Sequence, residues 1–330
     1  MGRATRCAVW FVPALLFSVL LVALPSFGIA QAERIRTKAE EPLPFVVLHG
    51  LGDACSNGGM GNFVSLLTSL SSANGSCVEV GRGASDSWLM RLDKQTEQAC
   101  SKLRAMPHLA RGFNLVGLSQ ASPAHSGDSS CFPFKHYSKW LFLGEHDPPL
   151  LHSFLPPTSM SRFPSPPPPA PPHLHSPPFS PPTPLLSPTL QNLVAPSGYV
   201  KIPTDISGYL AGCKYLPHVN NELASCRNAT YADRMRSLQR VALIKFTGDT
   251  VLYPPETAHF GFFAPNDFNK ILPINETQLY KEDWVGMKWL VEARRVDFIS
   301  VPGNHLWLTR GVIEKHVVPY LKPASGASSM

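Results

Sequence analysis

The stretch FNLVGLSQA, from Phe113 to Ala121, combines the pattern of a buried strand with that of a catalytic turn. Its first half is a compact apolar run, which is typical of a strand in a parallel sheet. Gly117-Leu118-Ser119-Gln120-Ala121 then approximates the G-x-S-x-G turn, which strains the serine backbone and exposes its hydroxyl above the sheet. Ala121 replaces the second glycine of that pattern, a change of one methyl group. Because a loop serine after any strand gives the same short pattern, Ser119 is a candidate nucleophile only together with suitable partners.

Similar apolar runs recur on both sides of this stretch, and helical patterns alternate with them. Asp93 is a candidate N-cap for one predicted helix and Asp283 for another. Alternating strand and helix signals indicate an α/β fold, with a mostly parallel sheet flanked by helices. Besides the strand that begins at Phe113, we predict strands at Phe45–Leu48, Cys77–Val80, Val241–Phe246 and from Val296 onward, and helices at Lys94–Met106, Asp283–Arg295 and Leu308–Leu321.

Two polar residues beyond predicted strands are suitable partners for Ser119. Asp249 follows Val241–Phe246, and His305 follows the strand that begins at Val296. A serine hydroxyl needs a histidine to accept its proton, and that histidine needs a carboxylate to fix its tautomer. Polar residues beyond the carboxyl ends of parallel strands meet at one edge of the sheet. We therefore predict a catalytic triad of Ser119, Asp249 and His305.

The motif HGLGD, from His49 to Asp53, follows the first predicted strand and supplies the remaining part of such a site. Backbone N–H groups of Leu51 and Gln120 are the candidates for an oxyanion hole. A glycine turn beside a satisfied histidine is the plainer interpretation, but its place after the first core strand favours a functional one. His49 is a rival for the role of general base, although it stands beside the oxyanion donor.

The N-terminus has the pattern of a secretory signal peptide, residues 1–32. Arg3 and Arg6 precede the apolar run Ala8–Val22, and a small-residue cleavage site ends near Ala32. A single membrane anchor is the alternative, but the run is short and prolines interrupt it. Three sequons, at Asn74, Asn228 and Asn275, fit a lumenal glycoprotein.

The net charge and the spacing of the cysteines argue against two classes of protein, nucleic-acid-binding proteins and zinc proteins. The formal net charge of +6 has no basic run to accompany it, so nucleic-acid binding is not indicated. We expect no cofactor and no metal, because the cysteines lack the paired spacing of a zinc site and disulfides are the default in an oxidising compartment. Connectivity cannot be deduced from spacing, and Cys213 with Cys226 is one candidate local bridge. The cysteines left after signal removal are Cys55, Cys77, Cys100, Cys131, Cys213 and Cys226.

The aromatic residues after Asp249 are candidates for an acyl-binding wall. The stretch YPPETAHFGFF lies between the predicted aspartate and the next helix, and a fatty acyl chain needs a long apolar groove. Ordinary core aromatics give the same pattern. The residues concerned are Tyr253, Phe260, Phe262 and Phe263.

Longer segments in the same order resemble the palmitoyl-protein thioesterase family: VVLHGLGD, GLSQ, VALIKFTGDTVLYPPETAHFGFF, NETQLYKEDWVGMKWL and PGNHLWL. The resemblance implies a lysosomal α/β-hydrolase that cleaves palmitate from cysteine thioesters, with S-palmitoylated proteins or peptides as partners. The family triad maps onto Ser119, Asp249 and His305, and its oxyanion donors onto Leu51 and Gln120. Two neighbouring positions depart from the family pattern, Thr250 for serine and Asn304 for aspartate.

The segment 121–190 does not resemble the family, and prolines make up almost half of residues 156–188. Such sequence is typical of a polyproline or disordered segment, serving as a linker or as an SH3/WW-type ligand. The family has a helix, a core strand and part of an acyl-binding insertion here. A join inside the elbow motif favours translated non-coding sequence or an aberrant splice form over an evolved insertion.

Loss of that family segment has predictable consequences. A sheet without its central strand should open in part, and Gly127–Ser130 should stop the helix behind Ser119 within about two turns. The triad should be close but imperfectly held, and Cys100 should lack its usual partner. The alternatives to a thioesterase are therefore an inactive secreted glycoprotein, or a lipase or carboxylesterase. The expected organisation is a signal peptide at 1–32, hydrolase halves at 33–120 and 191–323, the proline-rich segment 121–190 between them, and a flexible tail at 324–330.

Overall fold

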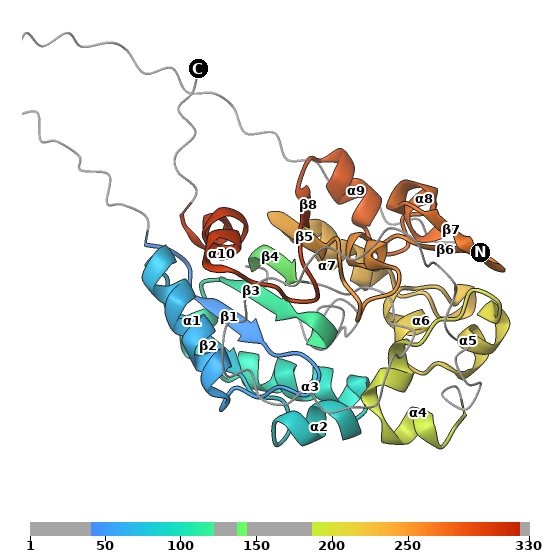
Figure 1. Cartoon of the computed structure of the whole chain (residues 1–330), viewed down its shortest axis with the longest axis horizontal. Coiled ribbons are helices and arrows are strands. Elements are labelled where there is room, and N and C mark those ends of the chain that lie inside the picture. The colour runs from blue at the N-terminus through green and yellow to red at the C-terminus, as the bar shows by residue number, and fades with distance from the viewer. Residues whose placement is uncertain (1–40, 122–136, 144–186, 324–330) are drawn as a thin grey trace, which may run out of the picture. The chain divides into compact units, whose positions relative to one another are not determined.

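The core of the computed structural model, which describes residues 41–121, 137–143 and 187–323, is a parallel sheet (Figure 1). Its strands follow the order β2-β1-β3-β4-β5-β8, and every neighbouring pair is parallel. Buried apolar runs form β1, β3 and β5, as expected for strands inside a sheet covered on both faces. The strands are β1 (Phe45–Leu48), β2 (Gly75–Val78), β3 (Phe113–Leu118), β4 (Tyr137–Leu143), β5 (Arg240–Phe246) and β8 (Val296–Val301).

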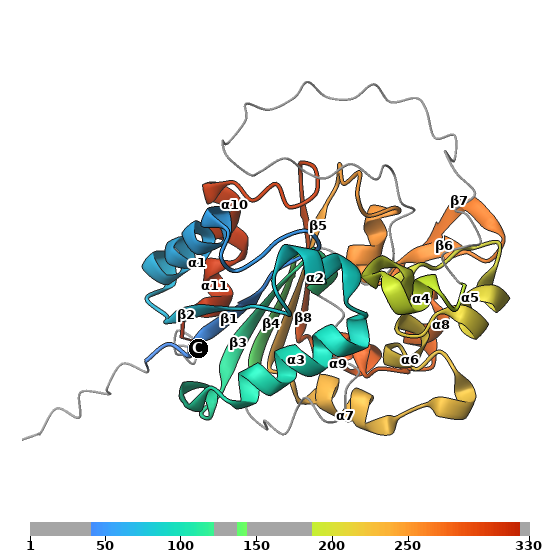
Figure 2. The same cartoon turned by 90° about the horizontal axis from the view of Figure 1, so that it is seen from below.

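Helices cover both faces of this sheet (Figure 2). One face packs on α3, α7 and α9, through side chains such as Leu103, Met235 and Leu290. The other packs on α1, α10 and α11, through side chains such as Leu67 and Ile313. These helices are α1 (Gly58–Ser71), α3 (Leu92–Arg104), α7 (Ala229–Ser237), α9 (Met287–Glu292), α10 (Arg310–His316) and α11 (Val318–Leu321), and α2 (Ala84–Leu89) precedes α3. The predicted α/β-hydrolase architecture, a parallel sheet flanked by helices, is confirmed.

Short elements form a second cluster beside the sheet (Figures 1 and 2). They are α4 (Leu190–Leu193), α5 (Ile206–Gly212), α6 (Leu216–Val219), α8 (Gln278–Lys281) and the antiparallel hairpin of β6 (Phe262–Ala264) and β7 (Asp267–Leu272). Tyr199, Tyr209 and Leu216 form a small core of their own with Leu92 of α3. Through Leu92, this core packs the cluster against α3, the α-helix that precedes β3 in the chain.

Strand β4 overturns the expectation of an opened sheet. It lies within the segment 121–190 and pairs with β3 on one side and with β5 on the other. Leu141 is in register with Val116 and with Ala242. The two hydrolase halves therefore share one continuous sheet, because a non-family sequence fills the central position with a strand of its own.

Three predicted helices begin or end at other residues than the sequence indicated, and the local backbone explains the differences. Helix α3 begins at Leu92 rather than Lys94, so Asp93 lies in its first turn and is not its cap. Asp283 does not begin α9 either, because Gly286 adopts a left-handed conformation with a φ of 83° and the helix starts after it. The predicted helix Leu308–Leu321 is divided at Val317, one residue before α11.

The cysteines pair differently from the local bridge considered above. Cys55 and Cys77 form a disulfide across 22 residues, which ties the loop after β1 to β2. Cys213 is buried, with its thiol directed at the carbonyl of Gly198, and Cys226 is exposed, so a Cys213–Cys226 bridge is not formed. Cys100 is disulfide-bonded as well, so the expectation that it lacks a partner is wrong.

Some predictions fall outside the described residues. They are the signal peptide at 1–32, Cys131, the end of the helix behind Ser119, the proline-rich run 156–186 and the tail 324–330. In the described part of the chain, no helix combines the length and the apolar character needed to cross a membrane.

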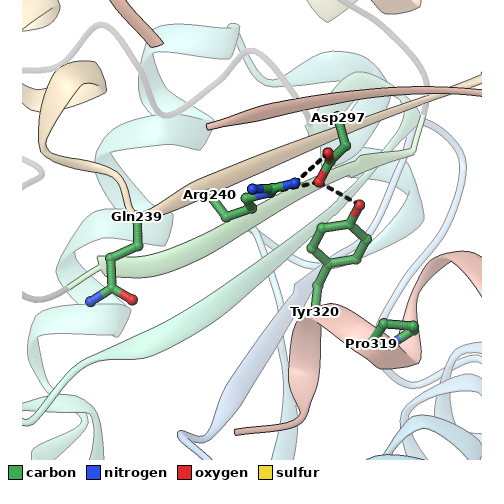
Figure 3. Close-up of a pocket in the computed structure, with 5 residues that line it drawn as sticks. All are labelled: Gln239, Arg240, Asp297, Pro319 and Tyr320. Carbon is green, nitrogen blue, oxygen red and sulfur yellow. Dashed lines mark hydrogen bonds and ion pairs between the residues drawn. The ribbon is translucent and has the colours of Figure 1, made fainter. Parts of the chain in front are cut away.

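A polar network joins the amino-terminal ends of β5 and β8 to α11 (Figure 3). The predicted triad residues follow the carboxyl ends of the strands. Arg240 donates two hydrogen bonds to Asp297, at 2.7 and 2.6 Å, and the Tyr320 hydroxyl donates a third at 2.7 Å. Together with Gln239 and Pro319 these residues line a cavity of about 400 Å³. Burial raises the pKa of Asp297, but the hydrogen bonds from Arg240 and Tyr320 outweigh it and leave the pKa below its usual 3.8.

Asp297→Asn is expected to destabilise the protein by about 1–2 kcal/mol at pH 7, because it weakens three hydrogen bonds to a charged acceptor. A carboxylate whose folded pKa is depressed stabilises the fold above its unfolded pKa and loses that effect as pH falls through the folded value. The difference in unfolding free energy between wild type and variant should therefore shrink below about pH 4. Urea unfolding at pH 7 and pH 3 measures it, with the exposed Asp233→Asn as control; a pH-independent difference would contradict the assignment.

Candidate active site

Ser119, His305 and Asp249 form a hydrogen-bonded series in which His305 lies between the other two, as predicted. Ser119 comes directly after β3 with a φ of 50°, the left-handed strain expected of a nucleophile turn. His305 Nε2 is 3.0 Å from Ser119 Oγ, and His305 Nδ1 is 2.7 Å from Asp249 Oδ2. With Nδ1–H donating to the carboxylate, Nε2 remains as the acceptor for the serine proton. The expectation of a loosely held triad is therefore wrong.

Asp249 is fixed by its own loop. Its second oxygen, Oδ1, accepts from the N–H groups of Val251 at 2.8 Å and Leu252 at 2.9 Å. Its side chain is only 2% exposed, whereas that of His305 is 13% exposed. The carboxylate thus has a set orientation, while the imidazole keeps access from outside.

The two positions that depart from the family pattern contact each other beside the triad. Asn304 Oδ1 accepts from the N–H and the hydroxyl of Thr250, at 2.9 and 3.0 Å, and from the N–H of His305 at 2.7 Å. The neighbouring backbone is joined as well, because the Gly248 N–H donates to the carbonyl of Gly303 at 2.9 Å. The loop of the aspartate and the loop of the histidine are therefore held as one unit.

The HGLGD loop lies directly against the nucleophile turn. A Cβ atom added at Gly50 would come to 3.0 Å from the Ser119 Cβ and 3.1 Å from the Leu118 carbonyl oxygen, so a larger residue here would push the nucleophile turn away by a few tenths of an ångström. The Leu51 N–H has no acceptor among the residues that the structure describes. Leu51, in this loop, and Gln120, which directly follows Ser119, therefore remain the candidates for the oxyanion donors.

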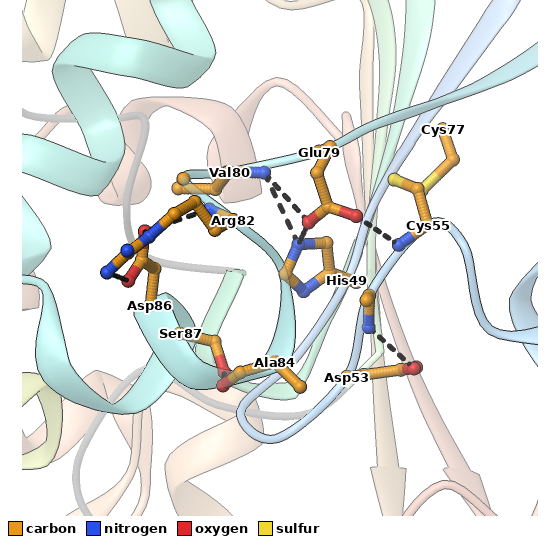
Figure 4. Close-up of polar contacts among 12 residues, drawn as sticks. His49, Asp53, Cys55, Cys77, Glu79, Val80, Arg82, Ala84, Asp86 and Ser87 are labelled. Atoms are coloured by element: carbon orange, nitrogen blue, oxygen red, sulfur yellow. Dashed lines mark hydrogen bonds and ion pairs between the residues drawn. A yellow bond between two sulfur atoms is a disulfide. The ribbon is translucent and has the colours of Figure 1, made fainter.

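His49 is engaged elsewhere than in the triad (Figure 4). Its Nε2 lies 2.7 Å from Glu79 Oε1, and its Nδ1 lies 3.1 Å from the Gly50 carbonyl oxygen. The other oxygen of Glu79 accepts from the Cys55 N–H at 2.7 Å. His49 therefore holds the loop in place, and among the described residues no serine hydroxyl is hydrogen-bonded to it.

One group of possible metal ligands occurs beside this loop. His49, Cys55 and Glu79 each present a ligand atom within 4.8 Å of the others. The sulfur of Cys55, however, is bonded to Cys77 and is not a thiolate. This trio does not suit a metal ion, since a thiol must be deprotonated and unbonded to bind one.

The predicted aromatic residues divide into two groups. Tyr253 and Phe263 are in ring contact at 5.5 Å, and Phe262 contacts Phe263 at 5.7 Å. Phe260 instead belongs to the buried core that the sheet shares with α3, α7 and α9. Phe268, which lies in the polar-looking stretch NDFN and carried no sequence signal, joins the first group at 5.4 Å from Phe263.

Comparison with known proteins identifies the family to which the chain is similar. A sequence model described as "Palmitoyl protein thioesterase" matches residues 44–123 and 182–305, and omits the centre of the proline-rich segment. The chain belongs to the palmitoyl protein thioesterase family. Membership identifies a hydrolase of thioesters with the α/β-hydrolase fold.

Two curated relatives of this thioesterase are similar over most of its length, and a third over a shorter part. Palmitoyl-protein thioesterase 1 of Caenorhabditis elegans is 27% identical over 303 residues, which cover 85% of this chain and 92% of the relative. Palmitoyl-protein thioesterase 3 of Dictyostelium discoideum is 26% identical, over 69% of this chain and 73% of the relative. A protein named lysosomal thioesterase PPT2 homolog, from Drosophila melanogaster, is 29% identical over 38% of this chain and 43% of its own length.

Proposed function

We propose that this thioesterase removes palmitoyl groups from cysteine residues of proteins, with Ser119 as nucleophile, His305 as general base and Asp249 as the residue that orients the histidine. Leu51 and Gln120 donate their backbone N–H groups to the oxyanion. The observation that carries the proposal is the hydrogen-bonded series from Asp249 through His305 to Ser119, in a chain of the thioesterase family.

The acylation half begins with proton transfer from Ser119 Oγ to His305 Nε2. The oxygen attacks the thioester carbonyl carbon, and the carbonyl electrons move onto oxygen, where the two backbone N–H groups stabilise the charge. Asp249 stabilises the imidazolium that forms. Collapse of the tetrahedral intermediate breaks the carbon–sulfur bond, the cysteine sulfur takes the proton from His305, and the acyl group remains on Ser119 as an ester.

Deacylation repeats the steps with water. His305 Nε2 takes a proton from a water molecule, whose oxygen attacks the ester carbonyl. The second intermediate then expels Ser119, which regains its proton from the imidazolium, and the fatty acid leaves. No cofactor enters either half of the cycle.

The test compares two substrates of equal acyl length. An S-palmitoyl cysteine peptide, with the released thiol trapped by a chromogenic disulfide, should give a larger kcat/KM than p-nitrophenyl palmitate. Preference for the oxygen ester would favour a lipase or carboxylesterase instead. No reaction with either substrate would favour an inactive glycoprotein.

We further expect the rate to grow with acyl chain length from eight to sixteen carbons. Each buried methylene contributes about 0.8 kcal/mol, equivalent to about fourfold in kcat/KM. Phe263→Ala should flatten this dependence, because Phe263 contacts Tyr253, Phe262 and Phe268. Phe298→Ala, at an exposed aromatic of β8, is the control. A flat profile in the wild type would argue against a long groove.

The proposed compartment is the lumen of the secretory route, with the lysosome as the destination. The Cys55–Cys77 disulfide fits an oxidising lumen. Two sequon asparagines, Asn74 and Asn275, are exposed, and Asn228 is half-buried at the start of α7. The name of the Drosophila relative supports the lysosomal part of the proposal. Glycosidase digestion followed by electrophoresis would show whether the chain carries glycans.

A further inference from the structure

Ser87 of α2 contacts both backbone segments that carry the proposed oxyanion donors. Its Oγ accepts from the N–H of Gly52, next to Leu51, at 2.7 Å, and its carbonyl oxygen accepts from Gln120 Nε2 at 2.9 Å. The Ser87 hydroxyl proton is directed to the carbonyl of Ala84 at 2.6 Å, so the hydroxyl faces Gly52 as an acceptor. Ser87 is only 1% exposed.

The side chain of Gln120 is held at both ends of its amide. Oε1 accepts from the Tyr199 hydroxyl at 3.1 Å, and Nε2 donates to Gln95 Oε1 at 3.2 Å as well as to Ser87. Gln95 is fixed in turn, since its Nε2 donates to the Met90 carbonyl at 2.7 Å. Gln120 is 3% exposed, so water does not compete for these bonds.

These contacts affect catalysis because an oxyanion hole depends on the direction in which its N–H groups point. Two N–H groups stabilise the developing charge only if both point at the same oxygen before the reaction starts. Leu51 lies in a loop whose next residue, Gly52, has a φ of 74°. Within this turn a long bond of 3.4 Å joins the Asp53 N–H to the Gly50 carbonyl, whereas the bond from the Gly52 N–H to Ser87 is 2.7 Å. Gln120 lies in the strained turn after β3. Ser87 is the residue that touches both.

We propose that Ser87 is a positioning residue that sets the two oxyanion donors relative to each other, and that Tyr199 assists through the side chain of Gln120. The inference rests on the proposed function. Ser87 lies in α2 and Tyr199 in the segment before α5, and neither residue contacts the reacting atoms in the proposed mechanism. Both act on the rate through the orientation of the oxyanion donors.

The main test compares Ser87→Ala with Ser71→Ala. Ser71 of α1 is an equally buried serine whose hydroxyl donates to the Leu67 carbonyl and accepts from the Ala73 N–H, away from the site. The two substitutions should lower the melting temperature by similar amounts. Ser87→Ala alone should lower kcat on the S-palmitoyl peptide by about ten- to a hundredfold, with KM within about twofold. The inhibition constant of a hexadecyl trifluoromethyl ketone, which forms a tetrahedral adduct, should rise by the same factor as kcat falls.

A second variant keeps the test decisive if Ser87→Ala does not fold. Tyr199→Phe removes only the hydroxyl that contacts Gln120 and should lower kcat about three- to tenfold. Tyr209→Phe, which removes a buried hydroxyl bonded to Glu222, is its control. Equal kcat in each variant and its control would overturn the inference.

Fluorophosphonate labelling separates this inference from the proposed function. Its rate constant also depends on the oxyanion hole, but it needs no thioester. A wild type that labels without cleaving the thioester refutes the proposed substrate, and the labelling ratio of Ser87→Ala to Ser71→Ala still decides the inference. A wild type that does neither refutes both.

Discussion

Ser119→Ala is expected to abolish cleavage of an S-palmitoyl peptide and to prevent labelling by a fluorophosphonate probe. Ser119 Oγ is the only protein group in the proposed mechanism that bonds to the acyl carbon, and water activated by His305 is a poor substitute for it in the acylation half. Removing one member of such a unit costs about as much as removing all, on the order of 10⁴- to 10⁶-fold in kcat. His305→Ala should therefore fall to the same level, and the double variant no further.

The controls separate this effect from loss of fold. Ser71→Ala removes a buried hydroxyl far along the chain from the triad, and His108→Ala removes an exposed imidazole; both should retain activity. Mass spectrometry of the labelled peptide identifies the modified serine. Labelling that persists at another serine would remove Ser119 from its role, and an active His305→Ala beside an inactive His49→Ala would exchange the two histidines.

The sequence predicted those parts of the site that follow single strands. Ser119, Asp249 and His305 follow β3, β5 and β8, of which β3 and β5 are largely buried apolar runs and β8 is a more exposed strand. Parallel strands end at a common edge, so their order along the chain was enough to bring the three side chains together.

The parts that the sequence did not predict depend on contacts between distant segments. Gln120 meets Ser87 across 33 residues and Tyr199 across 79, and no short motif encodes either contact. The Cys55–Cys77 pairing likewise depends on the register of β1 with β2 and cannot be read from cysteine spacing. The shortened α9 shows a local override, because one glycine in a left-handed conformation outweighs an apolar helical pattern.

Strand β4 is the clearest case of tertiary context deciding a local structure. The segment YSKWLFL has no clean period of its own and precedes a proline-rich run. It becomes a strand because β3 and β5 present unpaired backbone donors and acceptors on both sides. Leaving such groups unpaired in a buried sheet costs about 1–3 kcal/mol each. Any segment able to lie extended between them gains that amount for every pair it completes.

Leu141→Pro is accordingly expected to destroy the cooperative unfolding transition and the activity together. Proline removes a backbone N–H and does not fit a central strand, and Leu141 is paired on both sides, with Val116 and Ala242. A cost of about 3 kcal/mol or more is a large fraction of a typical stability of about 5–15 kcal/mol. Since β3 carries Ser119 and β5 leads to Asp249, separating these strands also separates the nucleophile from the base and its carboxylate.

Ala170→Pro is the matched control, because it adds one more proline to the run 156–188, where prolines already make up almost half of the residues. It should leave the melting temperature and kcat unchanged. Thermal unfolding followed by circular dichroism, with thioesterase activity measured on the same samples, compares the two variants. If Leu141→Pro had the same melting temperature and kcat as Ala170→Pro, residues 137–143 would not be the central strand. Another segment would then have to pair with β3 and β5, or the two strands would remain unpaired there. Loss of both properties in Leu141→Pro alone would mean that a sequence foreign to the family carries the strand on which its triad depends.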